Sequence, residues 1–142
     1  MTQTIALLQT CDAGVKTAVN SLENALRKTQ DEGLRRQLQR SLAEHRALGS
    51  ELKQALEAEQ AGGKPPSAMA RVMAQGKMNL RYAFSPSDAT VAELVWDGCA
   101  MGARTVCREE NRRRDADHTA HDLARRITDV EHRTARSLEP YL

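Results

Sequence analysis

The densest group of side chains that could bind a metal lies between residues 115 and 122. His118 and His121 are three residues apart, and His118 and Asp122 are four apart. On a helix these three side chains would share one face and could hold a divalent ion together. The alternative is a helix start, where aspartates such as Asp115 and Asp117 accept hydrogen bonds from free backbone amides. Because no cysteine or further histidine lies close by, we favour the helix start and assign no metal ligand.

A di-iron centre of the ferritin type would need a different set of residues. It takes a glutamate from each of two helices and a Glu-x-x-His pair from each of the other two. Neither Glu44 nor Glu131 is followed by histidine three residues later, and the Asp129-x-x-His132 pair lies off the apolar stripe of its segment. We therefore expect no cofactor, and keep iron or another divalent metal as the alternative.

Two other reactive side chains stand without catalytic partners. His45 interrupts a ladder of leucines, which is typical of a core histidine that hydrogen-bonds across a bundle. Cys107 is close to Arg104 and Arg108, so a regulatory thiol or an anion site remains open there. No base, nucleophile and orienting group occur together, so we assign no catalytic residue and lean against an enzyme.

The segment 34–60 is the element around which the rest must be organised. Its apolar residues recur every three or four positions, which places them on one stripe of a helix about 40 Å long. A single helix cannot bury such a stripe, so helices of similar length must lie beside it. The stripe comprises Leu34, Leu38, Leu42, His45, Leu48, Leu52 and Leu56.

Similar periodicity predicts three further long helices and one short one. We expect long helices at about 2–29, 34–60, 89–113 and 117–139, and a crossover helix at about 67–84, within a single domain 1–142. Short links join the first two helices and the last two, whereas a long connection separates these hairpins. That pattern predicts an all-α, ferritin-like four-helix bundle with a long crossover that contains a short extra helix. Gly98 and Gly102 would mark a close approach of another helix backbone.

Two segments also resemble a known family. They are MAQGKMNLRYAFSPSDATVAELVWDGCAMGA at 73–103 and AEHRALGSEL at 43–52. Both are similar to a bacterial ferritin-like family that is catalogued as a domain of unknown function. The resemblance implies a ferritin-like bundle whose role is not established, and it does not imply iron.

The composition limits the partners and the compartment. The 142 residues include 28% charged and 3% aromatic residues and have a net charge of +2, so no general attraction to nucleic acid or membrane follows. No apolar run approaches the roughly 18 residues of a membrane span. Three cysteines without CxxC spacing favour free thiols in a reducing compartment, and we expect a cytoplasmic protein.

The functional hypothesis is association. Trp96 lies off the expected core stripe of its helix, and the crossover carries Met69, Val72 and Met73. These four residues form the candidate interaction surface, for a homodimer or another protein partner. Trp96 would be covered either by the crossover helix or by a second copy of the chain. The alternative function is a metal-binding ferritin-like oxidase or storage protein.

Overall fold

The protein is all-helical in the part of the chain that the structure describes. The computed structural model describes residues 2–65 and 68–142, and within the first turns of the crossover helix, at 68–74, it describes the backbone alone. No strand occurs among these residues. The helices are α1 (Thr2–Lys28), α2 (Glu32–Ala58), α3 (Ala68–Phe84), α4 (Asp88–Arg112), α5 (His118–Leu138) and a terminal 3₁₀ helix, η1 (Glu139–Tyr141). Each α-helix begins and ends within two residues of the position expected from sequence periodicity.

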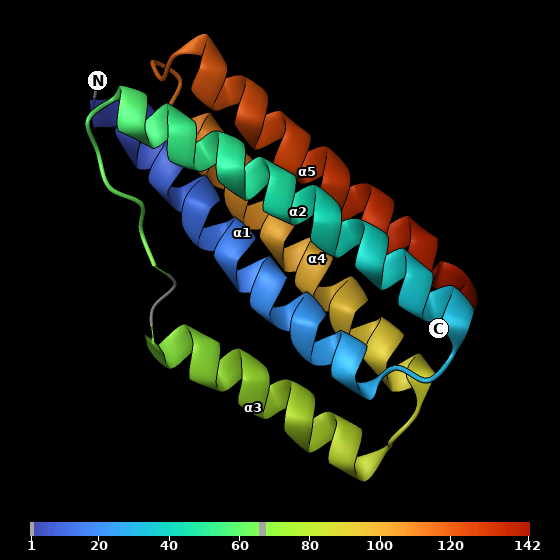
Figure 1. The fold of residues 1–142 in the computed structure, drawn as a ribbon. Helices are drawn as coiled ribbons and strands as arrows, with labels where there is room; N and C mark the ends of the chain where they lie inside the picture. Colours follow the sequence, from blue (N-terminus) through green and yellow to red (C-terminus); the bar gives the residue numbers. More distant parts are fainter. Residues whose placement is uncertain (1, 66–67) are drawn as a thin grey trace.

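The helices form two antiparallel hairpins joined by one long connection. Figure 1 shows α1 beside α2 and α4 beside α5, with α2 and α4 running in the same direction. The two hairpins pack through α1 against α4 and through α2 against α5. The connection from α2 to α4 contains α3, which lies outside the bundle along α1 and α4. Four long helices thus enclose the core, and α3 covers one side.

The leucine stripe of α2 is buried along its whole length, as its spacing predicted. Its residues contribute to two neighbouring apolar clusters, one toward each end of the bundle. Side chains from α1, α4 and α5 complete both clusters, which is why the helices must run nearly side by side. The members of the stripe at or below 2% exposure are Leu34, Leu38, Leu52, Leu56 and His45.

Side-chain caps fix the starts of α2, α4 and α5. Asp31, Ser87 and Asp117 each accept a hydrogen bond from the backbone amide three residues ahead, at 2.9, 3.1 and 2.9 Å. Asp88 also joins the two hairpins, because its carboxylate accepts from the backbone amides of Gln30 and Asp31 at 2.9 and 2.8 Å. The α1–α2 turn is thereby attached to the first turn of α4.

The crossover helix packs on the bundle through a few side chains. Met78 is buried, and the side-chain amide of Asn24 in α1 donates to its sulfur at 3.1 Å. Tyr82 donates to a backbone carbonyl at the end of α1 at 3.3 Å. Leu80 and Phe84 are 60% and 83% exposed. The side chains of Met69, Val72 and Met73, which we expected in the interaction surface, lie outside the described residues.

The two glycines of α4 differ from the expectation of a close backbone crossing. A methyl group at Gly98 would meet nothing within 4 Å, so the prediction is wrong there. At Gly102 the close neighbour is the carboxylate of Glu131 from α5, which occupies the space a methyl group would need. The neighbour is a side chain instead of a backbone. The buried face of α4 is completed by Cys99 and Ala103, at 5% and 3% exposure.

Candidate functional site

An open groove lies between α4 and α5 on the outside of the bundle, and Trp96 is one of its walls. The groove has a volume of about 420 Å³. It is lined by side chains of three kinds: the indole, small alanines and a set of polar groups. The lining residues are Trp96, Ala100, Ala103, Arg104, Cys107, His132, Ala135, Arg136 and Glu139.

The described residues cover the indole of Trp96 only in part and offer its nitrogen no acceptor. The ring is half-buried, and its Nε1 is shielded from solvent yet has no hydrogen-bond partner among the described residues. A shielded donor without an acceptor typically costs about 1–3 kcal/mol. The groove residues around the ring belong to α4, α5 and Glu139. Thus the ring lies on the side of α4 that faces α5, whereas α3 packs against α4 and α1.

The groove is polarised along its length. Arg104 and Cys107 are at the end nearer the C-terminus of α4, and Glu139 follows the C-terminus of the antiparallel α5. Glu139 therefore lies toward the Trp96 end. Cys107 is exposed, and its sulfur lies 3.9 Å from Oγ1 of Thr128. The groove thus has Arg104 at one end and both Arg136 and Glu139 at the other, with the indole and the alanines between these charges.

A second polar feature, a hydrogen-bonded histidine, lies in the centre of the bundle. Nε2 of His45 is 2.7 Å from Oε1 of Glu131, and the residues are 1% and 5% exposed. Nδ1 of His45 lies 2.8 Å from the backbone carbonyl of Ser41, to which it donates. Oγ of Ser41 is 2.7 Å from Oγ1 of Thr134 on α5. The expected core role of His45, hydrogen-bonded across the bundle, is confirmed.

The surroundings of the pair control its protonation. Burial alone would lower the pKa of His45, but the hydrogen bond and charge of Glu131 and the Ser41 carbonyl outweigh it, so the pKa is raised. Burial, followed by the charge and hydrogen bond of Glu131, raises the pKa of Cys99 and keeps it a neutral thiol. The hydrogen bond from His45 to Glu131 therefore links α2 to α5 and favours the protonated imidazole. With both members shielded from solvent, the arrangement suits a structural link better than catalysis.

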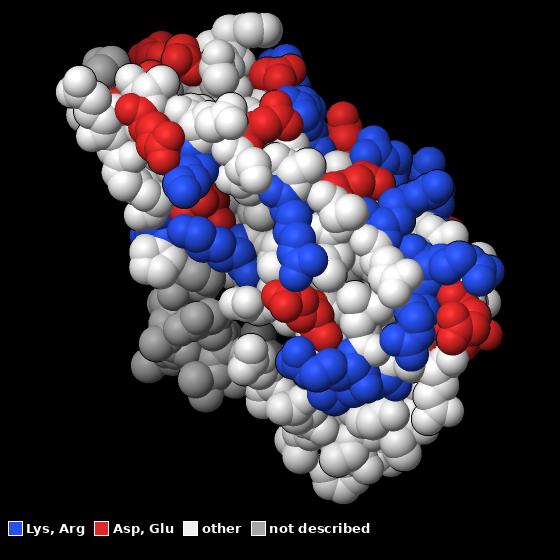
Figure 2. All heavy atoms as spheres, in the orientation of Figure 1, with Lys and Arg blue, Asp and Glu red and all other residues white. Residues whose placement is uncertain are grey.

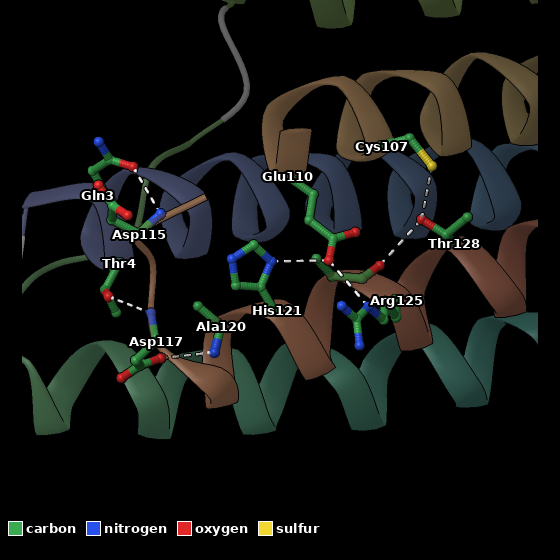
Figure 3. Close-up of polar contacts among 11 residues, drawn as sticks. Gln3, Thr4, Cys107, Glu110, Asp115, Asp117, Ala120, His121, Arg125 and Thr128 are labelled. Atoms are coloured by element: carbon green, nitrogen blue, oxygen red, sulfur yellow. Dashed lines mark hydrogen bonds and ion pairs between the residues drawn. The ribbon is translucent and has the colours of Figure 1, made fainter. Parts of the chain in front are cut away.

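Two of the three residues first considered as metal ligands, His121 and Asp122, are engaged with other side chains. Figure 3 shows His121 pointing at Glu110 of α4, with Nδ1 2.9 Å from Oε2, and Arg125 reaching the same carboxylate at 3.2 Å. His118 is exposed at the start of α5. Asp122 lies 3.7 Å from a guanidinium of its own helix. Among the described residues no group of three or more histidine, cysteine or acidic side chains is placed to hold a metal.

Of the two aspartates expected at the helix start, Asp117 is the one whose side chain caps α5. Asp117 caps α5 through Ala120, and its own backbone amide donates to Oγ1 of Thr4 at 2.9 Å. The backbone amide of Asp115 donates to Gln3 at 3.4 Å (Figure 3). The loop before α5 is in this way attached to the beginning of α1. These contacts hold the α4–α5 connection against the first turn of α1.

Glu131 and Ser41 were not expected from the sequence to be members of the buried network. Both are polar residues on apolar stripes: Glu131 follows Ile127 by four residues and precedes Thr134 by three. That spacing is the signal that could have found it, because positions three and four apart share a helix face. The same reasoning places Ser41 four residues before His45. A charged residue on the buried stripe of one helix is a candidate partner for a histidine on the buried stripe of another.

Comparisons with known protein families, with curated proteins and with solved structures found no match to this chain. Among the described helices, none is both long and apolar enough to cross a membrane. The three cysteines are free. The candidate functional site therefore rests on the geometry of this chain alone.

Proposed function

We propose that this protein is a non-catalytic helical bundle that acts by pairing with a second copy of itself, through the groove between α4 and α5. The observation that carries the proposal is the half-buried indole of Trp96, a large apolar ring in the wall of an open groove. A second chain in the groove would cover the part of the ring that the described residues leave exposed. Tryptophan is also among the residues that contribute most to protein interfaces.

The charges of the groove favour a second copy over an unrelated partner. In a closed two-fold dimer each residue i that contacts residue j is matched by j contacting i. If two grooves meet in antiparallel orientation, Arg104 of one copy faces Glu139 of the other, and the reverse contact forms at the far end. The reciprocal Arg104–Glu139 contact makes the groove complementary to itself in this arrangement, although Arg136 lies at the same end as Glu139.

The topology supports a ferritin-like classification within the same proposal. Two antiparallel hairpins are joined by one long connection that makes α2 and α4 parallel (Figure 1), which is the ferritin-like order of helices. The resemblance of segments 73–103 and 43–52 to a ferritin-like family of unknown function is consistent with it. We propose the fold likeness without the iron chemistry, because no group of three or more possible metal ligands occurs among the described residues.

Sedimentation velocity over a range of protein concentrations tests the proposal. We expect a wild-type dimer that dissociates at low concentration, and a weaker dimer for Trp96→Ala. Arg104→Glu and Glu139→Arg should each weaken the dimer, because each places like charges across the interface. Combining the two should restore it, since the pairing is then reversed at both ends. Lys53→Glu, an exposed substitution on α2, is the matched control and should leave the mass unchanged.

Two results would contradict self-association through this groove. One is a wild-type chain that stays monomeric at the highest concentration. The other is a dimer that tolerates both single charge reversals as well as it tolerates Lys53→Glu. If Trp96→Ala changes neither the mass nor the melting temperature, the ring is not part of an interface.

A further inference from the structure

A second groove, between α2 and α5, is built differently from the first. Its volume is about 330 Å³. The eight lining residues are all polar or charged, and three of them are arginines. They are Gln37, Arg40, Ser41, Glu44, Arg133, Thr134, Arg136 and Ser137.

The arginines make this groove positive. Arg40 comes from α2 and Arg133 and Arg136 from α5, so guanidinium groups stand on both walls. Against them stands one carboxylate, Glu44, which accepts from Nη2 of Arg133 at 2.7 Å. Arg136 also lines the groove of Trp96, so the side chains that belong to this groove alone are Arg40 and Arg133 against Glu44, a local charge of +1. Figure 2 shows lysine and arginine side chains gathered where the first half of α2 and the second half of α5 lie together.

The floor of the groove is a pair of buried hydroxyls, Ser41 and Thr134, at 3% and 5% exposure and 2.7 Å apart. One hydroxyl donates to the other, which uses one of their two protons. Oγ of Ser41 also lies 3.3 Å from Nδ1 of His45, but that nitrogen already donates to the Ser41 carbonyl. A hydroxyl proton is therefore left without an acceptor among the described residues, at the bottom of an arginine-lined groove.

Thr134 differs in this respect from other threonines of the bundle. Thr17, Thr29 and Thr128 each donate to the carbonyl four residues back in their own helix, at 2.9, 2.7 and 3.1 Å. Thr134 is turned across to Ser41 instead. A buried donor normally has a partner, and an acceptor held between the arginines would provide one.

We propose that the groove between α2 and α5 binds a small phosphate-bearing molecule. Arg40 and Arg133 would approach the phosphate oxygens from opposite walls, and the Ser41–Thr134 hydroxyl pair would donate from the floor. Guanidinium groups match the geometry of oxyanions because they offer parallel N–H donors. Arg133 engages Glu44 through one nitrogen and keeps further N–H groups for a ligand. The groove encloses a phosphate group together with a small organic part.

Thermal unfolding and calorimetric titration with inorganic phosphate, compared with sodium chloride at equal ionic strength, test the site. We expect phosphate to raise the melting temperature of the wild type and to show saturable binding. Arg40→Gln and Arg133→Gln should each weaken phosphate binding about tenfold or more, since charge-assisted hydrogen bonds are lost. Arg108→Gln, an exposed arginine of α4, is the matched control and should leave binding unchanged. Arg136 is left intact because it also lines the groove of Trp96.

The floor is tested by Thr134→Val, which keeps the shape and removes the hydroxyl, against Thr134→Ser, which keeps it. We expect Val to weaken phosphate binding and Ser to retain it, whatever either does to stability. Equal stabilisation of the wild type and every variant by phosphate would show a general salt effect and overturn the proposal. Binding to vesicles that contain phosphatidic acid without binding of glycerol phosphate would overturn it too, since the ligand would then be a membrane surface. Neither result bears on dimerisation, which these substitutions leave untouched.

Discussion

The imidazole of His45 and the carboxylate of Glu131 join α2 to α5 in the centre of the bundle, with Nε2 2.7 Å from Oε1. Neither residue is more than 5% exposed. The pair sits between two apolar clusters, which fill the ends of the bundle. Because a buried charge without its partner is costly, each member depends on the other.

Glu131→Gln should therefore destabilise the protein by about 3–5 kcal/mol near pH 6, where His45 is charged. Urea titration measures the free energy of unfolding. Glu51→Gln is the control, because Glu51 forms an exposed ion pair with Arg126 and such pairs contribute about 0–1 kcal/mol. Equal losses in the two variants would show that the buried pair contributes no more than a surface one.

The same pair gives a pH dependence with a defined sign. The pKa of His45 is raised in the folded state, so the folded protein binds this proton more tightly than the unfolded chain does. Its contribution is complete below the unfolded pKa of about 6.5 and is lost as the pH rises through the folded pKa. We expect the stability difference between wild type and Glu131→Gln to shrink from about pH 5.5 to about pH 8, below the range where cysteines titrate. A difference that grows with pH would contradict this assignment.

The sequence was sufficient to predict the helices because their signals are local. The leucine spacing of α2 and the caps Asp31 and Asp117 depend on neighbours within one or two turns, and these features appear in the structure. The length of the connection between the hairpins also predicted that the two helices it joins, α2 and α4, run parallel. Such features need no knowledge of how the helices are rotated against one another.

The rotation of α4 was not predictable in the same way. Gly98 and Gly102 are four residues apart and look alike in sequence, yet only Gly102 faces a neighbouring side chain at close range. Which glycine faces Glu131 depends on the packing of α4 against α5, a contact between distant residues. Trp96 was placed off the core stripe, but its position against α5 followed from the same rotation. The two grooves likewise arise from pairs of helices, so neither is visible in one segment.

Gly102→Ala and Gly98→Ala form a matched pair that tests this rotation. A methyl group at Gly102 would collide with the carboxylate of Glu131, whereas at Gly98 it meets nothing within 4 Å. Gly102→Ala should lower the stability by about 1–3 kcal/mol, despite the better helix propensity of alanine. Gly98→Ala should raise it by up to about 1 kcal/mol. Thermal unfolding of both variants decides the matter, and a gain at both positions would mean that α4 is rotated away from Glu131.

Leu52→Ala should be among the costlier substitutions on α2. Leu52 is fully buried in the cluster formed with α1 and α5, and emptying such a site typically costs about 2–5 kcal/mol. Gln39→Ala, on the exposed face of the same helix, should change the free energy of unfolding by less than about 0.5 kcal/mol. Guanidinium titration of both variants measures the contrast. Small and equal effects would show that the stripe of α2 does not face the core.

The last prediction separates a helix cap from a metal site at the start of α5. Asp117 accepts from the backbone amide of Ala120 at 2.9 Å, whereas Asp115 is exposed and contributes a backbone amide to its contact with Gln3. Asp117→Ala should cost about 0.5–2 kcal/mol, the usual effect of losing an N-cap, and Asp115→Ala should cost little. A structural metal would add its binding energy to folding, so its removal would lower the melting temperature. Because we expect Asp117 to act as a cap and not as a ligand, EDTA should leave the melting temperature of the wild type unchanged. A melting temperature that falls with EDTA, and that no longer responds to EDTA in Asp117→Ala, would instead assign the aspartate to a metal.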